Sequence, residues 1–430
     1  MSTINKAAAP SANHCSRDLR EWLTHLAATD RLAVAKPGLD LTHELAAVSD
    51  RLELDKALIA PSPSGHAVPV VANLLASRAW IGDCLGVSED DLIARYQDAV
   101  QNPVPWVEVD AGPVQDVVHR EVDINGQLPV PTHNELDSGP YISAGLMISR
   151  NPSNGIQNVS IHRCQISGKD RIGVLLLPRH TWTYARMAEE AGQALEVAIV
   201  IGIDPASLLA SQAIVPMDFD EMEIVGALHG APVEMVKCKT NNVRVPAKAE
   251  IVLEGRVLAN VQEPEGPFGE FPQYYGRQAN RHVIQVDAIT HRKKPIFHTI
   301  VGGGMEHLLL GGLPREATLL EPLQRNDPSV LDVHLSRGGT CRYHLVVKIR
   351  KKQEGQAKNI MMGAFAGHYD IKQVIVVDED VNIHDPESVE WAVATRFQAD
   401  QDLLVVANTQ ASKLDPTTTD DGVGAKMGID

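Results

Sequence analysis

Two glutamates that flank a constrained turn are the strongest candidates for chemistry in this sequence. Glu265 and Glu270 enclose the residues Gly-Pro-Phe-Gly, and a turn of this composition restricts how the two carboxylates are oriented. Two acids held in a partly apolar turn can have their pKa values pushed apart, which suits proton transfer. The alternative is a solvated acidic loop, which is the commoner role of an acidic pair. The pattern by itself leaves both interpretations open.

A second candidate is the segment Asn-Val-Ser-Ile-His-Arg at residues 158–163. In an extended strand, Asn158, Ser160 and His162 face one side, and Arg163 faces the other side with apolar neighbours. An arginine is costly to bury there unless a carboxylate or a phosphate pairs with it. The segment is therefore either part of a functional site or an edge strand with a surface arginine.

Residue types that bind hard metal ions occur in two further places. His180 follows the apolar stretch 172–177 closely, and four acids lie between residues 218 and 223. Together with Asn158 they could supply the nitrogen and oxygen ligands that Mn²⁺ or Mg²⁺ accepts. The alternatives are a structural histidine and a solvated or helix-starting run of acids. Composition does not choose among the four acids.

The composition excludes several classes of protein. The chain has 430 residues, 39 Lys+Arg against 55 Asp+Glu, a net charge of −16 and a pI near 5.5, which argues against binding a nucleic-acid backbone. Five scattered cysteines without a CxxC pair argue against a disulfide framework or a thiolate zinc site and favour a reducing, cytoplasmic location. No apolar run is long enough to span a membrane. Residues 1–14 lack the apolar stretch of a secretory signal and are interpreted as a frayed leader.

The length predicts two or three domains, and the patterning predicts α/β and α+β architecture. Helical spacing over 16–31 (with Ser16 as a possible cap), 41–54 and 88–100 (with a capping-box pattern that begins at Ser88), together with a strand at 68–72, indicates an N-terminal α/β domain over residues 1–112. A β-rich central domain over 113–313 follows, in which short strands form a mostly antiparallel sheet or barrel. Its expected strands are 142–149, 158–166, 172–177, 197–203, 233–237, 251–253, 282–289 and 296–300. Residues 314–430 are predicted to form a C-terminal α/β domain around the buried strands 345–349 and 374–377.

From about residue 122 onwards, the chain resembles the UbiD-type decarboxylases, the family that includes polyprenyl-hydroxybenzoate and ferulate decarboxylases. The resemblance depends on several ordered segments: NVSIHRCQ at 158–165, the strand and histidine at 172–180, the run from GALHGAP to IVLEG at 226–255, EPEGPFGEF at 263–271, NIMMGAF at 359–365, VIVVDEDVNIHD at 374–385 and KMGID at 426–430. So many matches in the same order make a chance coincidence very improbable.

The resemblance implies that the central domain is a split β-barrel that binds prenylated FMN, whose phosphate is bridged to the protein by Mn²⁺ (or Mg²⁺) and K⁺. Carried over by position, the metal ligands are Asn158, His180 and Glu221, and the catalytic residues are Arg163, Glu265 and Glu270. Glu221 is preferred to Glu223 because the family acid stands five residues before the glycine of an AGGL-like segment. The implied cofactor-binding residues are Ser160, Ile161, Arg163, Arg179, His180, Pro216, Met217, Glu221 and Lys351, with Lys352 and Lys358 as alternatives to Lys351.

The activity implied is a reversible, non-oxidative decarboxylation through a covalent adduct of substrate and cofactor. Glu270 would donate the proton, and Arg163 paired with Glu265 would position the substrate carboxylate. The substrate would be an aromatic, heteroaromatic or α,β-unsaturated acid, and we favour a small heteroaromatic or phenolic one. Leu176, Arg179, His298 and the 302–310 loop would lie near it. His298 would either hydrogen-bond the substrate or simply pack on the sheet.

Two other functions and several partners complete these expectations. The alternatives are a flavin-binding reductase or flavin-modifying protein on the split barrel, and an inactive structural relative. The resemblance also implies a flavin prenyltransferase as supplier of the cofactor, and a homodimer or homohexamer assembled through the C-terminal domain. Family members usually continue past the KMGID segment, so we expect the natural chain to extend beyond Asp430.

Overall fold

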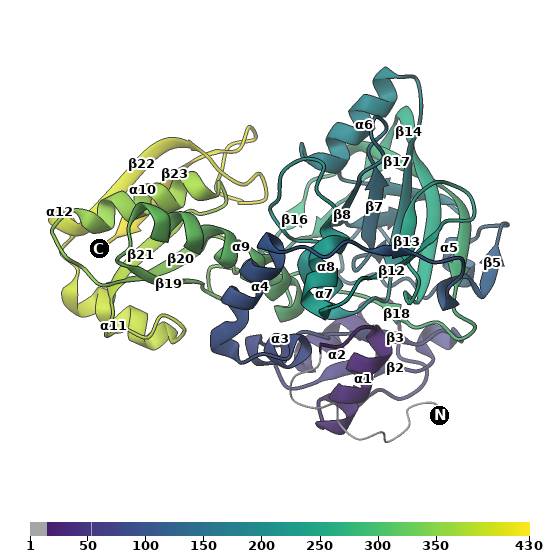
Figure 1. Cartoon of the computed structure of the whole chain (residues 1–430), viewed down its shortest axis with the longest axis horizontal. Coiled ribbons are helices and arrows are strands. Elements are labelled where there is room, and N and C mark those ends of the chain that lie inside the picture. Colours follow the sequence, from purple (N-terminus) through teal and green to yellow (C-terminus); the bar gives the residue numbers. More distant parts are fainter. Residues whose placement is uncertain (1–14, 53) are drawn as a thin grey trace. The chain divides into compact units, whose positions relative to one another are not determined.

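In the computed structural model, which describes residues 15–52 and 54–430, the chain divides into two units (Figure 1). The first unit holds the described residues up to Gly269 together with Tyr275–His307. The second holds Glu270–Tyr274 together with Leu308–Asp430. The predicted leader at residues 1–14 lies outside the described residues.

A nine-stranded antiparallel sheet dominates the first unit. Its order is β6 (Tyr141–Ile142), β9 (Cys164–Ile166), β10 (Arg171–Val174), β17 (Ala279–His291), β14 (Ile251–Glu265), β11 (Leu195–Ile201), β7 (Leu146–Arg150) and β8 (Gln157–Ile161), and β5 (Val117–His119) pairs with β17 off this path. β14 and β17 form a long curved pair in Figure 1, with two register shifts. Such irregularities increase the local twist and let a sheet curl. At one shift, a Cβ on Gly255 would lie 2.2 Å from the Gln285 carbonyl oxygen, so only glycine fits.

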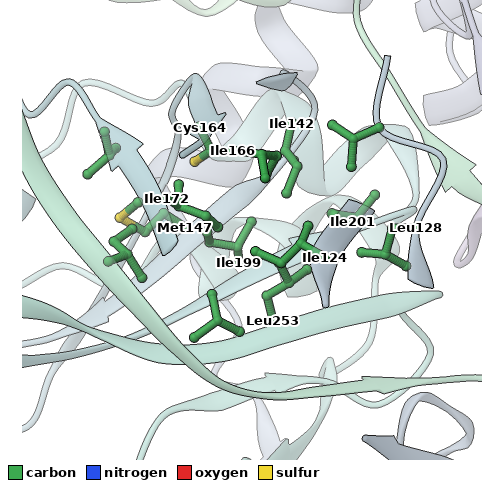
Figure 2. Packing of buried hydrophobic residues seen from close by; sticks show 14 of the residues in the cluster. Ile124, Leu128, Ile142, Met147, Cys164, Ile166, Ile172, Ile199, Ile201 and Leu253 are labelled. Carbon is green, nitrogen blue, oxygen red and sulfur yellow. The ribbon is translucent and has the colours of Figure 1, made fainter. Parts of the chain in front are cut away.

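The concave side of this sheet carries the main hydrophobic core. Alternate residues of its strands point inward, as the period of two requires. Figure 2 labels ten core residues, of which Ile124 and Leu128 come from α5 (Ile124–Gln127) and the residue that follows it. The others come from the sheet, among them Ile199 and Ile201 of β11, Leu253 of β14 and Met147 of β7. All four are at most 1 % exposed. The core therefore depends on the sheet that carries the candidate site residues.

A four-stranded sheet in the same unit unites distant parts of the chain. Its order is β1 (Leu32–Val34), β2 (Ala57–Ala60), β3 (Val70–Ala72) and β18 (Phe297–His298). β18 pairs in parallel with β3, through Phe297↔Val70 and His298↔Val71. The strand expected at 296–300 thus exists, but it completes the N-terminal sheet and not the central one.

Short sheets, 3₁₀ turns and helices complete the first unit. They are β4 (Val107–Glu108), β12 (Glu234–Lys237), β13 (Arg244–Pro246), β15 (Phe268–Gly269), β16 (Tyr275–Gly276), η1 (Pro63–Gly65), η2 (Glu89–Asp91), η3 (Pro113–Gln115), α1 (Leu19–Ala28), α2 (Glu44–Leu52), α3 (Arg78–Leu85), α4 (Leu92–Gln101), α5 (Ile124–Gln127), α6 (His180–Glu190), α7 (Pro205–Ala210) and α8 (Glu221–His229). Two expected caps differ. α1 is capped by Asp18, which accepts from Glu21 N, and not by Ser16. Ser88 donates to the Asp91 carboxylate, and makes no cap bond to the backbone.

The second unit is built on a five-stranded mixed sheet. Its order is β19 (Val330–Leu335), β20 (His344–Ile349), β21 (Gln373–Asp378), β23 (Val423–Ile429) and β22 (Leu403–Gln410). Its helices are α10 (Gln356–Gly367), α11 (Pro386–Arg396) and α12 (Ala399–Asp402), and α9 (Met305–Asn326) continues into it from the first unit. The apolar stretches 345–349 and 374–377 are buried strands, as predicted. No helix among the described residues is long and apolar enough to cross a membrane.

Candidate active site

Three of the expected metal ligands lie together in the first unit. Asn158 is on β8, His180 begins α6 and Glu221 begins α8. The Asn158 side-chain amide is oriented so that both its nitrogen and its oxygen have hydrogen-bond partners. In this orientation Nδ2 donates to His180 Nδ1 at 2.9 Å and to Glu221 Oε1 at 3.2 Å. Asn158 and Glu221 are 4 % and 2 % exposed. Residues from three separate elements thus converge on one buried point.

Local sequence explains how each of these side chains reaches that point. Asp220 caps α8 by accepting from Met222 N at 3.0 Å, which makes Glu221 the first residue of the helix. Glu221 Oε2 accepts from Val159 N at 2.6 Å, so the helix start is fastened to β8. His180 starts α6 six residues after Val174, the last residue of β10.

The other acids of the 218–223 run have different partners. Asp218 accepts from Asn151 Nδ2 at 2.6 Å and from Tyr184 at 3.1 Å. Asp220 accepts from Trp106 Nε1 at 2.9 Å, and burial raises its pKa to about 6. Glu223 is only half-buried. Of the four, Glu221 is the acid whose side chain contacts Asn158.

The donor set fits a hard divalent cation. Burial raises the pKa of Glu221 well above its usual value, and burial with the charge of Arg179 lowers the pKa of His180. A cation beside them would favour the ionised carboxylate and the neutral imidazole, which are the ligating forms. No group of three His, Cys, Asp or Glu side chains in the described part of the chain could hold a metal ion. The Asn158 amide would therefore have to turn, so that its oxygen, which accepts from Val159 N and Thr181 Oγ1 in the orientation above, becomes the third ligand, as suits Mn²⁺ or Mg²⁺.

A buried ion pair forms the second half of the site. Glu265 ends β14, and Arg163 precedes β9 at a break between two strands. Arg163 Nη2 lies 2.8 Å from Glu265 Oε2, and the two side chains are 8 % and 0 % exposed. The guanidinium also lies 5.4 Å from the centre of the Phe268 ring. The surface-arginine interpretation of this segment is therefore wrong, and the expected carboxylate partner is Glu265.

Tyr141 and Gln165 support this ion pair. The Tyr141 hydroxyl lies 3.1 Å from Glu265 Oε1 and 3.2 Å from Gln165 Oε1, which also accepts from Gly266 N at 3.0 Å. Both Glu265 oxygens thus contact a donor. Neither residue is predicted by its spacing. Gln165 is the last residue of the NVSIHRCQ segment, which is the signal that could have found it, whereas no motif marks Tyr141 on its two-residue strand.

Glu270 is held in a different environment. It belongs to the second unit, is 9 % exposed, and its backbone N donates to Tyr274 O at 3.0 Å. The next residue, Phe271, packs against the Tyr343 ring at 5.4 Å and the Arg342 guanidinium at 4.6 Å. Because both Glu265 and Glu270 are buried, the interpretation as a solvated acidic loop is wrong for both.

The remaining predicted cofactor residues divide between the two units. Ser160 and Ile161 end β8, and the Ser160 hydroxyl lies 2.9 Å from His162 Nε2. Arg179 directly precedes α6. Pro216 and Met217 lie in the turn before α8, where Met217 is 43 % exposed. Lys351 belongs to the second unit and pairs with Asp430 at 3.4 Å and Glu354 at 3.2 Å.

Family models match nearly the whole chain. The three domains of 3-octaprenyl-4-hydroxybenzoate carboxy-lyase, designated UbiD, match in order: the N-terminal domain at residues 23–100, the Rift-related domain at 106–305 and the C-terminal domain at 308–430. The anhydromevalonate phosphate decarboxylase of Methanothermobacter thermautotrophicus is 40 % identical over 363 residues, which cover 84 % of this chain and 85 % of the relative.

Solved structures of the same class superpose closely. The UbiD-class enzyme HmfF from Pelotomaculum thermopropionicum, in complex with FMN, has a TM-score of 0.94 and 47 % identity over 96 % of this chain and 93 % of its own. An evolved dimeric form of that enzyme, in complex with prFMN, has a TM-score of 0.91 and 45 % identity over 96 % and 94 %. The apo 3,4-dihydroxybenzoic acid decarboxylase from Enterobacter cloacae has a TM-score of 0.91 and 28 % identity over 97 % and 94 %.

Proposed function

The chain belongs to the UbiD family of carboxy-lyases, and from this premise we propose that it decarboxylates an aromatic, heteroaromatic or α,β-unsaturated acid reversibly, using prenylated FMN with Mn²⁺ (or Mg²⁺) and K⁺. The observation that carries the proposal is the buried Arg163–Glu265 pair in the same unit as the Asn158–His180–Glu221 group. A lyase assignment also decides against the reductase alternative, since solved relatives of this class are decarboxylases.

Each group has a role that its chemistry supports. Arg163 keeps its charge at any working pH and binds the substrate carboxylate, and Glu265 fixes the plane of the guanidinium. Asn158, His180 and Glu221 would hold the divalent cation, which would supply positive charge for the cofactor phosphate in this acidic chain. When bound, prenylated FMN supplies the electron sink for the bond that breaks. Glu270 returns a proton to the carbon that has lost CO₂.

The buried His298–Glu306 pair supports a substrate whose ring is uncharged and carries a hydrogen-bond donor. His298 Nε2 lies 3.1 Å from Glu306 Oε1, and their side chains are 0 % and 4 % exposed. His298 Nδ1 and Glu306 Oε2 are both buried without a hydrogen-bond partner. An N–H or O–H group on a substrate ring would satisfy such an acceptor, whereas leaving it unpaired is costly. We therefore favour a pyrrole-like, indole-like or phenolic acid.

A phosphorylated, non-aromatic acid is the second candidate, because the relative that is 40 % identical is an anhydromevalonate phosphate decarboxylase. Release of CO₂ from a panel that contains heteroaromatic acids, phenolic acids and anhydromevalonate phosphate separates the two. Turnover of the phosphate ester alone would refute the aromatic proposal.

The proton-donor role has its own test. Glu270→Gln should retain the cofactor, measured by its absorption, but lose at least 100-fold in CO₂ release. Glu379→Gln, which alters an exposed acid paired with Arg350 in the second unit, is the matched control and should keep normal turnover. Near-normal turnover in Glu270→Gln would exclude it as the donor.

We also propose that a flavin prenyltransferase supplies the cofactor, that the enzyme works in the cytoplasm, and that it forms a homodimer or homohexamer. The evolved dimeric form of HmfF supports the homodimer. Light scattering of the purified chain measures the assembly directly. A monomer at micromolar concentration would contradict it.

A further inference from the structure

Two thiols lie side by side in the first unit, remote in sequence from every residue assigned above. Cys15 is 8 % exposed, and Cys84, in α3, is fully buried. Ser16 N donates to Cys84 O at 3.2 Å, which holds the backbone next to Cys15 against that of Cys84. The Cys15 Sγ donates to the Ser16 carbonyl at 3.8 Å, and the two thiols are close enough for each to shift the pKa of the other. This backbone spacing is compatible with the short Cα separation that a disulfide needs.

The two thiols are chemically unequal. The hydrogen bond from Cys84 lowers the pKa of the Cys15 thiol more than burial raises it, and the nearby His229 lowers that pKa further. Burial and the same hydrogen bond raise the pKa of Cys84 well above its usual value. Cys15 is also the more exposed thiol, at 8 % against 0 % for Cys84, so an oxidant reaches it first. An accessible thiol beside a buried one is the arrangement of an attacking cysteine and a resolving cysteine.

An ion pair next to Cys15 maintains this inequality. His229 Nε2 lies 3.0 Å from Asp204 Oδ1, and the two side chains are 7 % and 5 % exposed. Asp204 also accepts from Ser207 Oγ at 2.7 Å, so its position is fixed. Although burial opposes it, the charge of Asp204 raises the pKa of His229. The positive charge of the His229 imidazolium lowers the pKa of Cys15, which favours the thiolate.

A cavity lies beside the Asp204–His229 pair. A cavity of about 260 Å³ is lined by Asp204 and His229, and by Arg17 and Asp18 of the segment that carries Cys15. Arg17 Nη2 donates to the His229 carbonyl at 3.1 Å, which fastens that segment over the end of α8. A volume of this size admits water and peroxide.

We propose that Cys15 and Cys84 are a redox pair, which a peroxide converts into a disulfide that fastens the segment before α1 to α3. The Cys15 sulfur attacks one peroxide oxygen, the O–O bond breaks, and the second oxygen leaves as water with the thiol proton. The Cys84 sulfur then attacks the sulfenic acid on Cys15, the S–O bond breaks and a second water leaves. Two thiols are oxidised by two electrons in total, and one peroxide is reduced to two waters. A dithiol reductant reverses the reaction.

The first test uses the purified full chain and needs neither cofactor nor substrate. One equivalent of hydrogen peroxide should remove two of the five titratable thiols, and peptide mapping should recover Cys15 linked to Cys84. The Cys15–Cys84 disulfide closes a loop of the chain and should therefore raise the midpoint temperature of thermal unfolding by roughly 5 °C. Dithiothreitol should restore five thiols and the original midpoint. Five thiols after peroxide, or equal loss at every cysteine, would overturn the proposal.

Variants test the separate roles of the two thiols. Cys84→Ser should leave Cys15 as a sulfenic acid that dimedone traps, whereas Cys15→Ser should trap none. His229→Gln should slow the alkylation of Cys15 at pH 7 several-fold. Cys341→Ser, a buried cysteine of the second unit, is the matched control and should still form the linked peptide. Sulfenic acid at Cys84 but not at Cys15 would refute the assignment of roles.

Discussion

Removing both partners of the Arg163–Glu265 pair should destabilise the first unit by much less than the sum of the two single removals. The charged atoms lie 2.8 Å apart, and the two side chains are 8 % and 0 % exposed. At an effective dielectric constant of about 20, their attraction is roughly 6 kcal/mol at that distance. Arg163→Met or Glu265→Gln alone leaves a buried group without its partner. Each should therefore lower the free energy of unfolding by about 3–5 kcal/mol. The double variant should lose about 3 kcal/mol less than the sum of the two.

Urea unfolding measures these free energies. Four of the five tryptophans lie in the first unit, so intrinsic fluorescence reports mainly on the unit that contains the pair. Glu263→Gln is the matched control, because its partner Arg171 is 42 % exposed and a surface pair contributes at most about 1 kcal/mol. Single-variant losses that add to the double-variant loss within about 0.5 kcal/mol would refute the coupling. Equal losses in Glu263→Gln and Glu265→Gln would refute the role of burial.

Three further predictions concern a glycine of the large sheet, the Asp204–His229 pair and the metal. Gly255→Ala should destabilise the first unit by about 3 kcal/mol or more, because its Cβ would lie 2.2 Å from the Gln285 carbonyl, while Gly338→Ala, with no atom within 4 Å, should be neutral in the same thermal melt. Asp204→Asn should lower the free energy of unfolding by about 2 kcal/mol near pH 6 and by less above pH 8. The pKa of His229 is raised in the folded state, so its stabilisation is complete below the unfolded value near 6.5 and is lost as the pH rises through the folded value; a loss that grows with pH would contradict this. Dialysis against a chelator should lower flavin retention, measured by absorption, and added Mn²⁺ should restore it; full retention without metal would count against the proposed cation.

Local patterns predict the elements better than they predict how the elements associate. The helical spacing of Leu19, Trp22, Leu23 and Leu26 predicts a buried face, and all four are at most 3 % exposed. The cap is a different matter, because Ser16 and Asp18 are both good capping residues and only the position of the first helical turn chooses between them.

In the candidate site, too, local patterns predict the need of a single residue but not the residue that meets it. The reasoning that Arg163 needs an anionic partner follows from its apolar neighbours and is correct. Its partner is 102 residues away, and only the register of β14 against β17 brings Glu265 to that point. Tyr141 contacts the same carboxylate and carries no sequence signal. Side chains that complete a site from another strand depend on tertiary pairing, which spacing along the chain does not encode.

The pairing of β18 with β3 has a consequence for how this protein is made. β3 ends at Ala72, and its partner begins at Phe297, roughly 220 residues later. A ribosome that adds 5–20 residues per second needs roughly 10–45 s to synthesise that interval. During that time the nascent N-terminal region presents the open edge of β3, which is a site for pairing with other chains. Slow stretches of translation before residue 297, or a fragment that stops at residue 112, should therefore increase the demand for chaperones.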